Sequence, residues 1–314
     1  MQKKFFLPVI MGILMAVLCT SVVFAEEETY KEDIFTYTVS NGQATITNVD
    51  DSRETVTIPE KLGDCTVTAL AGGACGGSSV IQEITLPDTI TVIGEMCFAY
   101  STGIRTVHLS AQLQNIEDGA FYQCESLWTI TIPSSVQRIG ANAFALCSNL
   151  SAATIPAGVT DIGSDAFQAS GGFRIYAKPD TAGAYFAVNN GIQFEELITV
   201  NVNGNDVVFD QPCITDTRYY KTMVPLRAVM EALGAQVSWD YTMNTTGIDI
   251  GGNRLLIRPG EPFMMVNGQA YYLSCPAIEF NDRVLLPIRD VVEAIGGKVG
   301  WDEGQKLVTI TYQP

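Results

Sequence analysis

The stretch "SLWTITIPSSVQRIGANAFALCSNL", residues 126–150, contains one complete copy of a pattern that recurs every 23 residues along the chain. Recurrence at a fixed period of this length is the signature of a repeat protein, in which each copy forms the same small structural unit. Four apolar columns keep the period over four copies: Ile81, Ile104, Leu127 and Leu150; Leu86, Leu109, Ile132 and Ile155; Ile93, Ile116, Ile139 and Ile162; and Phe98, Phe121, Phe144 and Phe167.

Each copy, called a rung below, follows the order L-x-x-I-x-I-P, V-x-x-I-G and A-F-x-x-C. Its first part alternates and is rich in β-branched residues, which predicts a short strand with one buried face. Proline ends this strand because its nitrogen has no hydrogen to donate, and Gly140 is expected to make the turn after Ile139. One rung cannot bury its own apolar face, so we predict a β-rich solenoid in which stacked rungs share a continuous core.

The rungs resemble the BspA-like leucine-rich repeats of bacterial surface proteins, and the resemblance covers residues 55–197. An atypical first rung, "VTIPEKLGDCTVTALAGGACGGSSVIQEITLP", places Leu70 in an isoleucine column and Cys75 in the phenylalanine column. The period breaks in "FRIYAKPDTAGAYFAVNNGIQFEEL", where residues 181–190 are expected to form a helix that caps the last rung. Residues 26–54 are expected to form an N-terminal segment and cap. The resemblance implies adhesion or protein interaction.

A second repeat follows in residues 198–314, where "MVPLRAVMEALGAQVSWD" recurs 62 residues later as "LLPIRDVVEAIGGKVGWD". In both copies, apolar residues at i, i+3, i+4 and i+7 predict an amphipathic helix, with proline in its first turn and glycine after its end. Short alternating segments such as "KLVTITY" predict strands around these helices, so we expect a separate α+β domain made of two similar copies. Opposite charges four positions apart can pair on each helix, namely Arg227 with Glu231 and Arg289 with Glu293.

These motifs resemble the copper amine oxidase N-terminal-like domain, or stalk domain, which is frequent in exported proteins of Gram-positive bacteria. A copper amine oxidase core binds its metal with three histidines and builds its cofactor from a tyrosine. This chain has a single histidine, His108, and it lies in the repeats. We therefore expect no copper and no other cofactor. Cys213 and Cys275 flank equivalent prolines of the two copies, and they form either a disulfide or two packed thiols.

The N-terminus has the order of a secretory signal peptide. Two lysines precede an apolar run from Phe5 to Phe24, and Ala25 stands before three glutamates. We expect cleavage after Ala25, so that residues 1–25 are a signal peptide and the protein is secreted or held at the cell surface. The apolar run is also close to the ~20 residues that span a bilayer, and a retained N-terminal anchor is the alternative.

Charge and composition disfavour several classes of function. The net charge is −16, and an acidic chain is a poor ligand for nucleic acid or anionic lipid. The single histidine disfavours a zinc site and a histidine-dependent nucleophile. The glycine-rich "GGACGGSS" (residues 72–79) lacks the GK[ST] ending of a P-loop and falls in register with the first rung. A pair of catalytic carboxylates is left open by the 34 acidic residues, but no motif points to one, and we expect no enzyme and no metal site.

The repeat register assigns most cysteines to packing positions. Cys124 and Cys147 share a column with serines, and Cys97 stands in a column of alanines. Such columns accept small side chains, so we expect buried thiols in the core. A disulfide between Cys124 and Cys147 on adjacent rungs is the alternative.

A solenoid offers its outward strand columns to a partner. Trp128 interrupts a polar column, as a contact residue does, although it can also pack on its own scaffold. The candidate binding residues are Arg105, His108, Trp128, Thr129 and Thr131.

We expect an exported, non-enzymatic protein that recognises a protein or cell-envelope ligand, or adheres to it, through the solenoid, with the C-terminal domain as a stalk. The alternative is a module in which the C-terminal domain binds cell-wall glycan or peptidoglycan.

Overall fold

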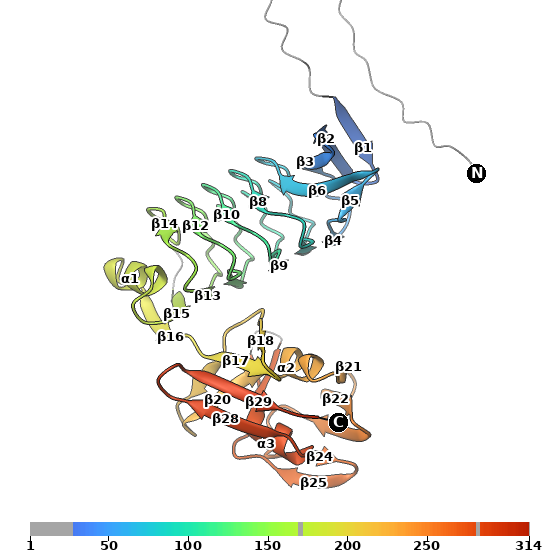
Figure 1. Cartoon of the computed structure of the whole chain (residues 1–314), viewed down its shortest axis with the longest axis vertical. Coiled ribbons are helices and arrows are strands. Elements are labelled where there is room, and N and C mark those ends of the chain that lie inside the picture. The colour runs from blue at the N-terminus through green and yellow to red at the C-terminus, as the bar shows by residue number, and fades with distance from the viewer. Residues whose placement is uncertain (1–27, 169–171, 281–282, 314) are drawn as a thin grey trace, which may run out of the picture. The chain divides into compact units, whose positions relative to one another are not determined.

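The computed structural model describes residues 28–168, 172–280 and 283–313 (Figure 1). The predicted signal peptide, residues 1–25, lies outside this part of the chain. Within the described ranges, no helix is both long and apolar enough to cross a membrane.

The described residues form two compact units. The first takes in the chain up to Leu127, Pro133–Leu150, and the stretch that begins at Gly158. The second takes in Trp128–Ile132, Ser151–Ala157, and the chain from Gly172 onward. The last strands of the repeats therefore group with the C-terminal region, and the domain boundary at residues 197 and 198 stays a prediction.

A nine-stranded sheet runs through the first unit in the order β1-β2-β3-β6-β8-β10-β12-β14, with β5 paired to β6. Its first three strands are antiparallel, and from β3 to β14 the strands along this path are parallel. Its strands are β1 (Thr29–Glu32), β2 (Phe35–Ser40), β3 (Gln43–Val49), β5 (Lys61–Leu62), β6 (Cys65–Leu70), β8 (Val92–Ile93), β10 (Asn115–Ile116), β12 (Arg138–Ile139) and β14 (Asp161–Ile162).

Residues that are 23 positions apart in the sequence pair with each other on neighbouring strands of this sheet. Ile93, Ile116 and Ile139 are direct partners on successive strands. The phenylalanines stack in the same way: Phe98, Phe121, Phe144 and Phe167 have ring centroids 4.8, 5.0 and 5.2 Å apart. This spacing is close to the 4.7–4.9 Å between neighbouring strands, so each ring lies on the ring of the rung before it. The predicted β-rich solenoid with a 23-residue period is confirmed.

Gly140 is needed for a close approach between rungs, and not for the turn predicted from the sequence. A Cβ atom there would lie 2.5 Å from the backbone nitrogen of Asp118 on the preceding rung. The residues with positive φ follow further along the rung, at Asn142 (φ 55°) and Leu146 (φ 60°). The turn therefore takes its left-handed backbone from residues other than glycine.

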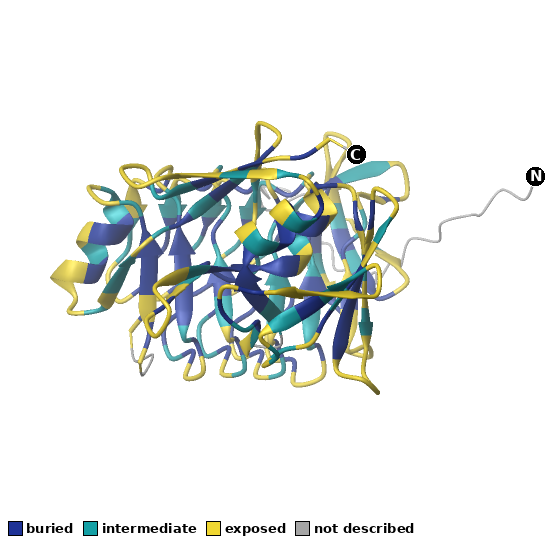
Figure 2. Cartoon of the chain, turned by 90° about the horizontal axis from the view of Figure 1, so that it is seen from below, coloured by how far each residue is buried: buried dark blue, intermediate teal, exposed yellow. Residues whose placement is uncertain are grey.

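The strands predicted from L-x-x-I-x-I-P form two further parallel sheets, with orders β4-β7-β9 in the first unit and β11-β13-β15-β16 in the second. Burial concentrates on the strands and exposure on the connecting turns (Figure 2). The strands are β4 (Thr55–Thr57), β7 (Glu83–Thr85), β9 (Thr106–His108), β11 (Thr129–Thr131), β13 (Ala152–Ile155), β15 (Arg174–Ala177) and β16 (Gln193–Glu196).

Helix α1 (Ala182–Asn189) follows β15, where the sequence predicts a helical cap. It buries its small residues Gly183, Ala184 and Ala187. A Cβ atom at Gly183 would lie 2.9 Å from the Cβ atom of Ile155 on β13. Glycine is therefore what allows this helix to lie close to the sheet.

The C-terminal region contains three sheets, with orders β18-β17-β29-β28, β19-β20-β27-β26 and β21-β22-β23-β24-β25. Their strands are β17 (Thr199–Val202), β18 (Asn205–Val207), β19 (Ile214–Asp216), β20 (Lys221–Pro225), β21 (Gln236–Asp240), β22 (Thr245–Ile250), β23 (Asn253–Ile257), β24 (Phe263–Val266), β25 (Gln269–Tyr272), β26 (Ile278–Phe280), β27 (Arg283–Pro287), β28 (Lys298–Asp302) and β29 (Leu307–Thr311).

The two copies of this region are joined through equivalent residues. Val224 on β20 pairs with Leu286 on β27, its own counterpart 62 positions later in the sequence. The pairing is antiparallel, as a local two-fold relation between the copies requires. It builds one sheet from both copies.

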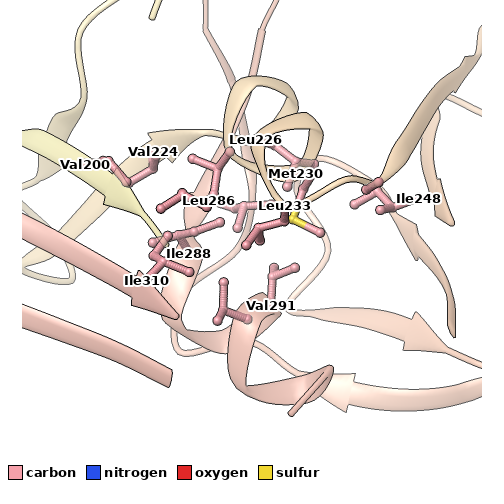
Figure 3. Close-up of a cluster of buried hydrophobic side chains, with 14 of the residues drawn as sticks. Val200, Val224, Leu226, Met230, Leu233, Ile248, Leu286, Ile288, Val291 and Ile310 are labelled. Atoms are coloured by element: carbon pink, nitrogen blue, oxygen red, sulfur yellow. The ribbon is translucent and has the colours of Figure 1, made fainter. Parts of the chain in front are cut away.

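The predicted helices are α2 (Leu226–Ala232) and α3 (Ile288–Ala294), each preceded by its proline. Gly234 and Gly296 follow them with φ of 85° and 87°, which is the left-handed position where glycine ends a helix. Their apolar faces meet in one buried cluster (Figure 3). The predicted surface pairs are present, with Arg227 Nη1 3.4 Å from Glu231 Oε1 and Arg289 Nη1 3.3 Å from Glu293 Oε1.

Candidate functional site

The residues predicted to bind a partner lie on two successive rungs. Arg105 is exposed just before β9. On the same strand His108 is half-buried, and its Nε2 lies 3.0 Å from Glu83 Oε1 on β7. In the second unit, Trp128 is 46% exposed, so the larger part of this indole is already in contact with protein.

The two threonines predicted for the same surface are less open. Thr129 is half-buried, and its hydroxyl donates to the Asp210 carbonyl at 3.1 Å within the second unit. Thr131 has a buried hydroxyl oxygen with no hydrogen-bond partner. Ala152 and Thr154, which continue these outward columns on β13, are buried with 7% and 9% exposure. Of the five predicted residues, Arg105 and Trp128 are therefore exposed, and His108 is half-buried.

Two other columns of the repeats adopt left-handed backbone on successive rungs. The first contains Gly73, Met96, Gly119, Asn142 and Asp165, with φ between 54° and 71°. The second contains Gly77, Tyr100, Gln123 and Leu146, with φ between 56° and 77°. Glycine, asparagine and aspartate tolerate this conformation, whereas other L-residues lose roughly 1–2 kcal/mol in it. Met96 therefore occupies a position where other rungs use glycine, asparagine or aspartate, whereas Tyr100 shares its left-handed position with Gln123 and Leu146.

Met96 and Tyr100 form an apolar cluster with Tyr122, here called the turn cluster. Tyr100 is 51% exposed and Met96 37% exposed. The rings of Tyr100 and Tyr122 meet edge to face with centroids 5.5 Å apart. The Met96 Sδ atom covers Gly119, because a Cβ atom at that glycine would lie only 2.4 Å from it.

The sequence contained a signal for the turn cluster that residue-by-residue analysis missed. Met96 is a large apolar residue in a column otherwise filled by glycine, asparagine or aspartate, and this is visible once the rungs are aligned. The backbone strain at Met96 and Tyr100 is evident only from their positive φ angles in the structure.

Some charged side chains near the turn cluster form ion pairs with described residues, and Glu95 does not. Arg138 lies among three acids, with nitrogen–oxygen distances of 2.6 Å to Glu117, 2.9 Å to Asp118 and 3.5 Å to Asp161. Its hydrogen bond to Asp118, together with the negative charge of Glu117, raises the pKa of the Arg138 guanidinium. In contrast, the exposed Glu95, next to Met96, joins no ion pair with any described residue.

Four cysteines of the repeats, Cys75, Cys97, Cys124 and Cys147, are buried, whereas Cys65 of the first rung is partly exposed. Cys124 and Cys147 are fully buried, and each thiol donates to a carbonyl 26 positions earlier at 3.1 Å, that of Phe98 or of Phe121. Ser101 makes the equivalent bond to the Cys75 carbonyl at 2.7 Å, which explains why the column accepts serine or cysteine. Burial raises the pKa of the Cys147 thiol to about 12.

Cys213 and Cys275 lie in different buried clusters of the C-terminal region, both as thiols. The Cys275 sulfur is 3.5 Å from the Met223 sulfur. The disulfide between Cys213 and Cys275 stays a prediction.

The C-terminal region carries a second set of exposed aromatic residues. Tyr272 on β25 is 76% exposed, and its ring lies 6.2 Å from that of its cross-strand partner Phe263 on β24. Met265 and Leu256 continue the same face of the sheet as half-buried residues. In the part of the chain that the structure describes, no three histidine, cysteine or acidic side chains converge on a possible metal position.

The fold defines a leucine-rich-repeat protein with an additional α+β region. Residues 71–179 match the BspA type leucine rich repeat region in six copies, and residues 201–310 match the copper amine oxidase N-terminal domain. These two regions belong to those families. The leucine-rich-repeat family is non-enzymatic, and the copper amine oxidase N-terminal domain is not catalytic.

Solved leucine-rich-repeat proteins resemble the repeat region. One from T. pallidum is 24% identical over 55% of this chain and 73% of its own, with a TM-score of 0.45. One from Bacteroides ovatus is 26% identical over 48% of this chain and 41% of its own, with a TM-score of 0.44. One from Bacteroides capillosus is 29% identical over 40% of this chain and 96% of its own, with a TM-score of 0.38. No curated protein matches the chain.

Proposed function

We propose that this is an exported, non-enzymatic protein whose solenoid recognises a protein partner, with the C-terminal region as a stalk. The turn cluster is the observation that supports this function best. Solvent-exposed Met and Tyr are enriched in protein interfaces, and here two of them lie at backbone positions that disfavour their side chains. Strain that persists at an exposed site is often connected with function.

The proposed partner has basic groups around an apolar contact. The chain carries a net charge of −16, and Glu95 beside the turn cluster is available to a positive charge. Complementary charge increases the association rate and selects among partners more than it adds affinity. Binding is therefore expected to slow in high salt.

Capture of cell-surface proteins on the immobilised full chain tests this function. We expect proteins retained by wild type to be lost with Tyr100→Asn, which removes the ring and suits the left-handed backbone. Tyr220→Ala is the matched control, because this tyrosine is 85% exposed in the C-terminal region. Equal retention by wild type and Tyr100→Asn would contradict a role for the turn cluster.

A second candidate function is binding of cell-wall glycan through the C-terminal region. The exposed Tyr272 and its cross-strand partner Phe263 support it, because exposed aromatic rings on a flat sheet can stack against sugar rings. Sedimentation of the full chain with purified cell walls tests it. Tyr272→Ala is expected to leave more protein in the supernatant, and Tyr220→Ala again serves as the control. A supernatant fraction that does not change with Tyr272→Ala would exclude this face.

The proposed export of the protein rests on the predicted signal peptide, residues 1–25. Mass determination of protein recovered from outside the producing cell tests it. A chain that begins at Glu26 is the expected result, and an intact N-terminus would favour the retained anchor.

A further inference from the structure

Cys75 and Cys97 occupy one structural pair that recurs along the solenoid. On later rungs, a phenylalanine N–H donates to the carbonyl of an alanine 22 positions ahead, as Phe98 does to Ala120 at 2.7 Å. In the first rung the same bond runs from Cys75 to Cys97 at 2.8 Å. Cysteine therefore replaces both the large and the small member of the pair.

This double replacement brings two thiols together. Cys75 is smaller than the phenylalanine of its column, and Cys97 is larger than the alanine of its own. The backbone bond between them places the two residues side by side on adjacent rungs. They are 3% and 0% exposed.

The backbone spacing suits a covalent bridge. Cys75 and Cys97 lie in turns of adjacent rungs that this backbone hydrogen bond joins, and disulfides join residues whose Cα atoms are about 4.4–6.8 Å apart. Cys124 and Cys147 are a poorer pair, because they share one column and each thiol already donates to a carbonyl of an earlier rung.

We propose that Cys75 and Cys97 are a disulfide site that links the first two rungs of the solenoid. The oxidant is a disulfide, either glutathione disulfide or a protein dithiol oxidase. The thiolate of one cysteine attacks the oxidant, forms a mixed disulfide and releases one thiol. The second cysteine displaces the second thiol and closes the Cys75–Cys97 bond. Two electrons and two protons pass to the oxidant, which leaves as two thiols.

The bridge forms during folding and not afterwards. Burial raises the pKa of the Cys97 thiol, and a thiol without its thiolate form is a poor nucleophile. The closed bond replaces the ring that the first rung lacks, at the start of the phenylalanine stack. This inference is independent of the function proposed above.

Refolding of the full chain in a glutathione redox buffer tests the proposal. Without reduction, trypsin and a glutamate-specific protease cut at Lys61, Glu83, Glu95 and Arg105. We expect peptides 62–83 and 96–105 to remain joined, with the mass of the intact chain lowered by two hydrogen atoms. Cys65 also lies in the first peptide, so Cys65→Ser must retain the link.

Two substitutions that restore the residue of the column serve as controls. Cys97→Ala is expected to fold and to lose the link, whereas Cys124→Ser is expected to keep it. Reduction should lower the thermal midpoint of wild type by several degrees and leave that of Cys97→Ala unchanged. Eight reactive thiols in the refolded, denatured chain, or peptide 96–105 joined to another cysteine, would overturn the assignment.

Discussion

Tyr100 meets Tyr122 of the next rung edge to face, with ring centroids 5.5 Å apart, although its own backbone is left-handed with φ of 62°. An aromatic pair of this kind contributes about 0.5–1.5 kcal/mol, and the left-handed conformation costs roughly 1–2 kcal/mol. The pair therefore does not explain Tyr100 by stability alone. An exposed ring that the fold does not need is available for a partner.

The strain at Tyr100 can be measured by comparing two substitutions. Tyr100→Asn is expected to leave the free energy of unfolding within ~1 kcal/mol of wild type, because relief of strain offsets the lost contact. Tyr100→Val is expected to lower it by more, since β-branched residues are poorly accommodated at positive φ. Urea unfolding measures both, and equal effects would show that the backbone at residue 100 is not strained.

The phenylalanine stack is expected to dominate the stability of the solenoid. Phe121 is fully buried between rings at 4.8 and 5.0 Å, and Phe121→Ala should lower the free energy of unfolding by about 3–5 kcal/mol. Val188→Ala, at a residue 69% exposed on α1, should change it by less than about 0.5 kcal/mol. Similar losses for the two variants would contradict a stacked core.

Gly140 is expected to tolerate no side chain. Its Cβ atom would lie 2.5 Å from a backbone atom of the preceding rung, and crowding of this kind costs about 1–3 kcal/mol. Gly304→Ala is the control, because its nearest neighbour would be 3.5 Å away. If thermal unfolding shows Gly140→Ala to be as stable as Gly304→Ala, the rungs are not in close contact at this glycine.

Stability is expected to fall in alkaline solution because of buried thiols. Burial raises the pKa of Cys147 and of Cys213 from about 9 to about 12. Their contribution is therefore complete below pH ~9 and is lost towards pH ~12, by up to about 1.4 kcal/mol per pH unit for each thiol. Urea unfolding of wild type and Cys147→Ser across this range measures the effect. Ionisation of the tyrosines affects wild type and Cys147→Ser equally, so it cancels in the difference between their unfolding free energies. A difference that does not change with pH would contradict the prediction for Cys147.

Much of the solenoid could be predicted from the sequence because each structural position occurs several times, once on every rung. Phe121, Phe144 and Phe167 lie in one stack because the period fixes their register. The two short helices also followed from spacing and from their flanking proline and glycine. Local rules were sufficient wherever the determining contacts recur on every rung.

Other features depended on contacts that local rules do not reach. Ala152 and Thr154 share the columns of Thr129 and Thr131, but the alternation of the sequence does not show that both residues are buried. Gly140 appeared to be a turn residue because the closeness of the preceding rung is invisible in one sequence. The pairing of Val224 with Leu286 joins two copies that the sequence shows only as separate segments.

Substitution of Trp128 distinguishes between a role in partner binding and a role in packing. If it is a contact residue, Trp128→Ala should weaken capture of the partner and leave the thermal midpoint unchanged. If it packs on its own scaffold, the midpoint should fall. Differential scanning fluorimetry and capture on the same protein preparations separate these outcomes.

The most direct test of the proposed function is the dissociation constant of the captured partner for wild type and for Tyr100→Asn, measured with the full chain. A tyrosine at the centre of an interface contributes about 2 kcal/mol or more, so we predict an increase of about thirtyfold or more at unchanged stability. Equal dissociation constants for wild type, Tyr100→Asn and Trp128→Ala would contradict recognition through the solenoid.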